Sequence, residues 1–104
     1  MSQQMLRITL EEKSDAVVLK LEGRLAGPWA AELDRLWEEI SRDIAQKKLS
    51  VDLRETTFAD ASGIRILKAI YSQTGAVFLS GTPWTQYLAE EVASNNSHQT
   101  GPEV

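Results

Sequence analysis

The chain has 104 residues, of which 42% are hydrophobic and 25% charged, and this suits one small domain with a single core. Eleven basic against fifteen acidic residues give a net charge of −4, which argues against nucleic acid and anionic membranes as partners. The absence of cysteine excludes disulfides, thiolate metal sites and a cysteine nucleophile, and one histidine excludes a His-rich metal cluster. We therefore expect no cofactor and no metal. No apolar run is long enough to span a membrane and no secretory signal is recognisable, so we also expect a cytoplasmic protein without membrane insertion.

The N-terminal segment predicts a β-hairpin. Apolar residues alternate with polar ones over residues 6–10 and again at every second position over residues 17–21, which is typical of half-buried strands. The polar residues 11–15 form a turn between them, so the two strands are expected to be antiparallel. Gly23 is expected to end the second strand.

A long amphipathic helix is predicted from Pro28 to about residue 47. Pro28 suits the first helical position, directly after Gly27. One helical stripe carries the apolar residues, so both of its tryptophans are expected to face the core. The stripe consists of Trp29, Leu33, Leu36, Trp37, Ile40 and Ile44.

The second half of the sequence alternates strands with helices. A strand over residues 49–53 is followed by a helix over residues 62–72, with Gly75 as its C-terminal stop. The apolar run 76–80 predicts a central strand. Thr82 then caps a third helix that has Pro83 at its first position and a stripe of Trp84, Leu88 and Val92.

These elements predict an α/β fold in the order ββαβαβα. We expect a small mixed sheet of about four strands, an antiparallel hairpin followed by parallel strands, packed with about three helices. The domain spans residues 1–93. Residues 94–104 are polar and lack periodicity, so they are predicted to be a flexible tail, and this tail contains His98.

Residues 57–64 form the one segment whose residues exceed what folding alone requires. They connect a strand to a helix, where α/β proteins place binding loops, and Ser62 is positioned to cap that helix with Asp60 two residues before it. Such a pair has an ordinary structural role, because a Ser cap and a nearby carboxylate both stabilise a helix start. A hydroxyl at a helix start is also exposed to solvent, and an added phosphate there would meet free backbone N–H groups.

The same segment resembles the signature of the STAS domain family, the bacterial anti-sigma factor antagonists. The matching residues are Val51-Asp52-Leu53, then Phe58, then Asp60-Ala61-Ser62-Gly63-Ile64, together with Gly23-Arg24-Leu25 after the second strand. The order of elements also agrees over residues 6–93.

The resemblance implies a regulatory protein-binding module and not an enzyme. It identifies Ser62 as the serine that a kinase phosphorylates and Asp60 as a residue that shapes the loop and contacts the kinase. Two departures bear on partner choice: Ala61 replaces the first Ser or Thr of the motif, and residues 23–28 lack the usual acidic residue after Leu25. The partner-binding residues implied are Phe58, Asp60, Ala61, Ser62, Gly63, Arg24 and Leu25.

The partners implied are a serine-kinase-type anti-sigma factor, which the unphosphorylated domain binds, and a phosphatase that resets the switch. An alternative within the same family is an accessory subunit of an ABC-type lipid transport complex that binds its ATPase. Nucleotide binding by the domain is a weaker hypothesis, because no glycine-rich phosphate loop is present. Catalysis is disfavoured because no Gly-x-Ser-x-Gly elbow occurs and His98 lies in the tail.

Overall fold

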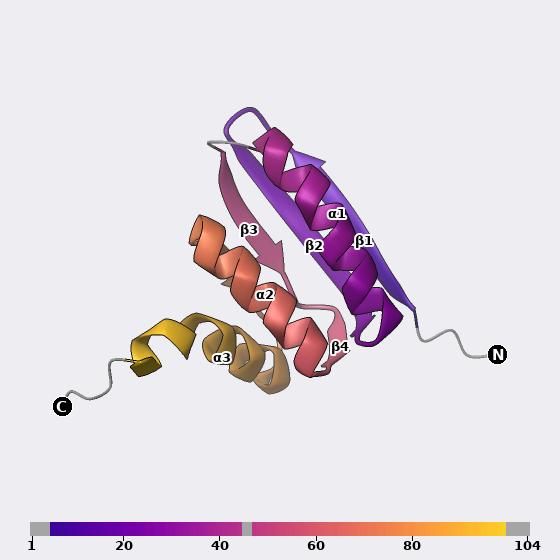
Figure 1. The fold of residues 1–104 in the computed structure, drawn as a ribbon, viewed down its shortest axis with the longest axis vertical. Helices are drawn as coiled ribbons and strands as arrows, with labels where there is room; N and C mark the ends of the chain where they lie inside the picture. The colour runs from indigo at the N-terminus through magenta and orange to yellow at the C-terminus, as the bar shows by residue number, and fades with distance from the viewer. Residues whose placement is uncertain (1–4, 45–46, 100–104) are drawn as a thin grey trace.

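Five strands and three helices make up the fold in this computed structural model, which describes residues 5–44 and 47–99 (Figure 1). It confirms the mixed α/β class, the antiparallel hairpin and the three helices. The elements are β1 (Leu6–Glu12), β2 (Ala16–Leu25), α1 (Pro28–Ile44), β3 (Lys48–Asp52), β4 (Thr56–Ala59), α2 (Ala61–Thr74), β5 (Val77–Leu79) and α3 (Pro83–Gln99).

Strand β2 is the centre of the sheet. It pairs with β1 in antiparallel fashion along one side, from Leu6 opposite Gly23 to Glu12 opposite Val17. Along its other side it pairs in parallel with β3 at its beginning and with β4 at its end. Strand β5 then pairs in parallel with β3, which gives the order β1-β2-β3-β5 with β4 beside β2.

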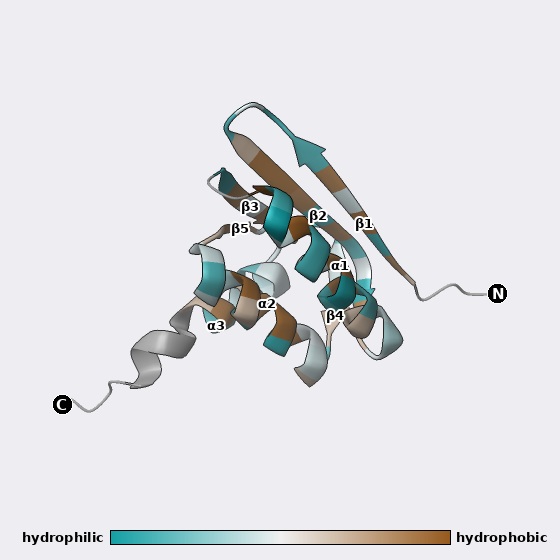
Figure 2. Ribbon diagram, turned by 45° about the horizontal axis from the view of Figure 1, so that its top comes forward, coloured by the Kyte–Doolittle hydropathy of each residue, from teal (hydrophilic) through white to brown (hydrophobic). Residues whose placement is uncertain are grey.

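Helices α1 and α2 form a second layer over one face of the sheet, and α3 packs against α2 and β5 (Figure 1). In Figures 1 and 2 both α1 and α2 lie on the same side of the strands, and Figure 2 shows hydrophobic residues concentrated along β2 and α2. The predicted inward stripe of α1 is confirmed for Leu33 and Trp37, which are buried, and Trp29 packs partly buried against the same core. The largest fully buried side chains are Leu19, Leu21, Leu25, Leu33, Leu53, Leu67, Ile70 and Leu88.

Strand β4 was not predicted, and Gly23 does not end β2 as expected. The strand continues to Leu25 because β4 supplies a further parallel neighbour, with the register shifting between Gly23 and Arg24. Gly23 has φ 106°, and a Cβ at this position would lie 2.4 Å from the carbonyl oxygen of Met5. Glycine is therefore required where the strand shifts register, and it does not act there as a terminator.

Strand β5 lies at the edge of the sheet and is not the central strand that its apolar sequence indicated. Val77 is 59% exposed on the face without helices, whereas Phe78 packs against Tyr71 on the helical side. An apolar run of this length does not distinguish a central strand from an edge strand that is covered on one face.

The helix boundaries agree with the local signals at most positions. Gly75 takes the left-handed conformation after α2, and the Thr82 hydroxyl accepts the N–H of Thr85 at the start of α3, as predicted. Helix α1 ends at Ile44, before the expected position 47. Helix α3 continues to Gln99 and so includes His98. The flexibility of residues 94–104 stays a prediction, and residues 100–104 lie outside the described part of the chain. Within the residues described, no helix has the length and apolar character needed to span a bilayer.

Candidate functional site

Two loops meet at the carboxyl ends of β2 and β4. Leu25 lies opposite Ala59 in the parallel register, so the chain leaves both strands at the same edge of the sheet. The backbone N–H of Asp60 donates to the carbonyl oxygen of Leu25 at 3.2 Å. The loop before α1 is thereby placed beside the start of α2, as expected from the parallel arrangement.

Asp60, and not Ser62, is the N-cap of α2. Its backbone is extended (φ −94°, ψ −175°), and its Oδ1 accepts the backbone N–H of Gly63 at 2.9 Å. The same oxygen accepts the hydroxyl of Ser62 at 2.7 Å, while Oδ2 accepts the N–H of Gly27 at 3.0 Å. The prediction that Ser62 caps the helix is wrong because a cap must stand outside the first turn, and Ser62 is the second residue within it.

These donors make Asp60 a stable anion. The Ser62 hydroxyl, followed by the N–H groups of Gly63 and Gly27, lowers the pKa of the Asp60 carboxyl to about 2. The carboxylate is therefore ionised at neutral pH, with its charge next to the Ser62 oxygen. It also connects the two loops of the site through hydrogen bonds to both.

Ser62 lies partly buried at the mouth of a groove between the starts of α1 and α2. The groove has a volume of about 200 Å³, and Ser62 lines it together with Gly27, Ala31, Asp34 and Arg65. The hydroxyl is thus neither in the interior nor within a strand, and the Ser62 side chain is partly accessible to solvent. Arg65 was not singled out from the sequence, although its spacing of three residues from Ser62 places the two on one helix face.

Gly63 allows α2 to approach β2 closely. It is buried, and a Cβ at this position would lie 2.2 Å from the carbonyl oxygen of Leu25 and 2.8 Å from its Cγ. Leu25 itself is fully buried, so in this conformation it shapes the site from beneath and offers no side-chain surface to a partner. Ala61 is exposed at the first position of the helix.

Arg24 and Phe58 form a second exposed feature beside the loops. They lie opposite each other in the β2–β4 register, and the Arg24 guanidinium carbon lies 4.3 Å from the centroid of the Phe58 ring. This distance is typical of a cation–π contact. Phe58 remains 37% exposed, and because its neighbour Ala59 packs against the core, the pair lies on the face of the sheet away from the helices.

Asp52, the acidic residue of the Asp-Leu motif, has a structural environment. It is 4% exposed, and its Oδ1 accepts both the backbone N–H and the Nε of Arg54 at 3.0 Å, while Oδ2 accepts Nη2 at 2.9 Å. The hydrogen bonds from the Arg54 guanidinium hold the pKa of the Asp52 carboxyl below its usual value. This ion pair fixes the turn after β3 and leads the chain into β4.

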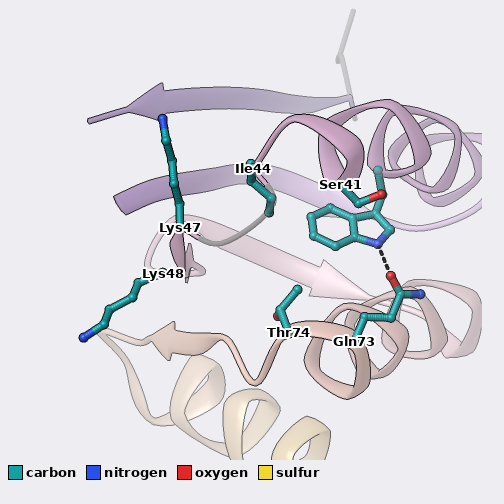
Figure 3. A pocket seen from close by; sticks show the side chains of 7 residues that line it. Ser41, Ile44, Lys47, Lys48, Gln73 and Thr74 are labelled. Carbon is teal, nitrogen blue, oxygen red and sulfur yellow. Dashed lines mark hydrogen bonds between the residues drawn. The ribbon is translucent and has the colours of Figure 1, made fainter. Parts of the chain in front are cut away.

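A separate cavity of about 550 Å³ lies at the opposite ends of α1 and α2 (Figure 3). The indole N–H of Trp37 donates to Oε1 of Gln73 at 3.0 Å and joins the two helices there. Figure 3 shows the side chains of Lys47 and Lys48 extending away from this hydrogen bond, and Lys47 pairs instead with Glu12 at 3.4 Å. Across the described residues, no group of three or more acidic or histidine side chains could hold a metal ion.

Comparison with known proteins identifies a family. The family model of the STAS domain matches residues 7–85. The fold is similar to that of an anti-sigma factor antagonist from Mycobacterium paratuberculosis (TM-score 0.74, 19% identity, covering 97% of this chain and 86% of that one). It is also similar to the anti-sigma factor antagonist SpoIIAA in its unphosphorylated form (TM-score 0.64, 15% identity, covering 88% of this chain and 81% of that one). A third similar structure is an antisigma-factor antagonist STAS domain from Rhodobacter sphaeroides (TM-score 0.55, 18% identity, covering 88% of this chain and 98% of that one). No curated protein sequence matches the chain.

Proposed function

The chain belongs to the STAS domain family, and on this basis we propose that it is an anti-sigma factor antagonist that is switched by phosphorylation of Ser62. In its unphosphorylated form it binds a serine-kinase-type anti-sigma factor, and the kinase releases it by transferring the γ-phosphoryl group of ATP to the Ser62 hydroxyl. A phosphatase reverses the modification. The domain supplies a surface and a phosphate acceptor, and it performs no catalysis itself.

The position of the Ser62 hydroxyl carries this proposal. It lies on the first turn of α2, at the mouth of a groove, and donates to an ionised carboxylate 2.7 Å away. The hydrogen bond holds the side chain in one orientation, and the free backbone N–H groups of a helix start tolerate a nearby anion. An acceptor that lies at the surface of a groove and is fixed in orientation suits a kinase active site.

The neighbouring residues supply a docking surface of suitable character. Phe58 and Arg24 lie opposite each other on adjacent strands, on the face of the sheet away from the helices, and aromatic and arginine side chains are enriched at the centres of protein interfaces. Asp60 adds a fixed negative charge beside Ser62, at the ends of the same strands. A partner that covered the loop at Asp60 would enclose Ser62, so a phosphate there would be buried against it.

The magnitude of the expected switch is large enough for regulation. A phosphoserine carries a charge of about −1.5 to −2 at neutral pH. Burying such a charge without compensation in an interface costs about 2–5 kcal/mol, which weakens binding roughly thirtyfold to several thousandfold. The fold should change little, because repulsion from Asp60 opposes the favourable effect of the helix dipole.

The test combines phosphorylation and binding. The chain, Ser62→Ala and the control Ser41→Ala are each incubated with the kinase-type anti-sigma factor of the same organism and ATP, and intact mass is measured. Ser41 is a good control because it is another partly buried helical serine, whose hydroxyl donates to the Glu38 carbonyl oxygen. One phosphate should be added to the wild type and to Ser41→Ala, and none to Ser62→Ala. Equal phosphorylation of Ser62→Ala would refute the site.

The binding arm uses Ser62→Asp. This variant should bind the anti-sigma factor at least about thirtyfold more weakly than the wild type, while its melting temperature stays within a few degrees of the wild-type value. If the chain instead co-purified with a transport ATPase regardless of the residue at position 62, the accessory-subunit hypothesis would replace this one.

A further inference from the structure

Strand β1 forms one edge of the sheet and has a neighbour on one side only. The sheet order places it at the end, paired with β2. In Figures 1 and 2 no other element of the described chain lies along its outer side. Its seven residues make it a longer edge than β5, which has three. An exposed edge of this length can pair with another strand.

The backbone groups that face outward along this edge can be identified. The N–H of Lys13 donates to the carbonyl oxygen of Ala16 at 2.8 Å, and this pair lies one residue beyond Glu12 opposite Val17, in the same register as β1 and β2. Odd-numbered residues of this segment therefore make the hydrogen bonds to β2. Because hydrogen bonding alternates along an antiparallel strand, the even-numbered residues direct their N–H and C=O groups away from β2. These outward residues are Leu6, Ile8, Leu10 and Glu12.

The side chains of β1 have a symmetric arrangement about Thr9. Arg7 and Glu11 lie two residues on either side of it and share the face of the sheet opposite the helices, because Leu6 on the other face is buried. Both are exposed, and in the part of the chain that the structure describes neither has an ion-pair partner. Ile8 and Leu10 lie one residue on either side of Thr9 on the helical face, where Leu10 is 39% exposed.

We propose that two copies of the chain associate by pairing their β1 strands in antiparallel fashion, with the two-fold axis at Thr9. In this register Arg7 lies opposite the partner subunit's Glu11, and Glu11 lies opposite the partner subunit's Arg7. Ile8 lies opposite the partner subunit's Leu10, so the exposed leucine is covered. The outward backbone groups of the even-numbered residues then bond to each other across the axis, and the charged pairs fall at the positions where side chains approach most closely.

Neighbouring registers fit less well. A two-fold axis at Ile8 sets Arg7 opposite Thr9 and leaves the acidic residues without a basic partner. An axis at Leu10 sets Arg7 opposite Lys13, and like charges directly opposite each other destabilise a sheet. The charges on the strand therefore favour one register among those that the backbone hydrogen bonds allow.

The dimer would leave the groove at Ser62 free. Ser62 follows β4, which pairs with β2 on the side away from β1. Because the two sheets join in antiparallel fashion, the two Ser62 loops would lie at opposite ends of one continuous sheet. This inference does not depend on phosphorylation of Ser62.

The test is a charge exchange read by sedimentation equilibrium on the full chain. Wild type should pass from the monomer mass of 11.6 kDa towards twice that value as concentration rises, over a range of about 1 µM to 1 mM, which covers the affinities of weak contacts. Arg7→Glu and Glu11→Arg should each self-associate at least about tenfold more weakly, because each places like charges opposite one another. Both positions are exposed, and circular dichroism confirms that each variant is folded.

An equimolar mixture of the two variants gives the decisive result. Arg7→Glu has acidic residues at both positions and Glu11→Arg has basic residues at both, so the mixed pair restores two opposite-charge contacts and should associate at least as tightly as wild type. Its total charge equals that of two wild-type chains, since the net charge falls by two units in Arg7→Glu and rises by two units in Glu11→Arg. A wild type that remains monomeric throughout, or variants that dimerise alone as well as they do together, would overturn the proposal.

Discussion

Replacing Gly63 by alanine tests whether the close contact between α2 and β2 determines the site. Gly63 is within a helix, and by helix propensity alone alanine should stabilise this position by about 1 kcal/mol. The structure indicates the opposite. The added Cβ would lie 2.2 Å from the Leu25 carbonyl oxygen, and that oxygen belongs to a strand that cannot move freely.

The size of the effect follows from these two opposing contributions. Overpacking of a rigid contact costs up to about 3 kcal/mol, which leaves a net loss of about 2 kcal/mol after the gain in propensity. For a domain of this size, that loss lowers the melting temperature by roughly 8–16 °C. The displaced helix start would also weaken the hydrogen bond from the Gly63 N–H to Asp60.

The matched control is Gly81→Ala. A Cβ at Gly81 would lie 3.1 Å from Cγ of Arg54, a much looser contact than at Gly63, and a side-chain carbon needs to shift only a few tenths of an ångström to relieve it. Its melting temperature should therefore stay within a few degrees of wild type in differential scanning calorimetry. If Gly63→Ala melted at or above the wild-type temperature, the close approach of α2 to β2 would not be a constraint and the reasoning would be wrong.

Three further predictions concern the cap, the core and the exposed pair. In Asp60→Asn the melting temperature at pH 7 should fall. Because the fold lowers the pKa of Asp60 from 3.8 to about 2, the ionised carboxyl stabilises the fold fully at pH values well above 3.8, and this contribution is lost as the pH falls through about 2. The melting temperatures of wild type and variant should therefore converge on acidification. Leu67→Ala empties a fully buried position and should cost about 2–5 kcal/mol in urea unfolding. Phe58→Leu removes the cation–π contact with Arg24 and should cost no more than about 1 kcal/mol by the same assay.

The elements that the sequence predicted well are those with local signals. Pro28, Gly75 and Thr82 mark helix ends through their own backbone or side-chain chemistry, and all three stand where they were expected. The hydrophobic stripe of α1 likewise depends only on spacing along one helix. Such features need no knowledge of the rest of the chain.

The features that were missed depend on contacts between distant segments. Strand β4 has four residues and little alternation, and it forms because its Thr56 hydroxyl bonds to the Leu21 carbonyl oxygen and its backbone pairs with the end of β2. The choice of Asp60 as cap has a similar origin. Two capping residues stood close together in the sequence, and the N–H of Gly27, 33 residues away, adds a bond that only Asp60 makes. Nothing local to residues 57–64 indicates that bond.

The hydrogen bonds of Asp60 explain why a phosphate on Ser62 would act on a docked partner more than on the fold. Phosphorylation replaces the hydroxyl hydrogen, so Asp60 would lose one donor and keep the N–H groups of Gly63 and Gly27. Those two bonds hold the start of α2 and the loop before α1 together without any contribution from Ser62. The phosphate would be repelled by the ionised Asp60 on one side and would face the groove on the other, which both the basic Arg65 and the acidic Asp34 line. A partner seated in that groove would meet the new charge directly, whereas the core beneath Gly63 would remain shielded from it.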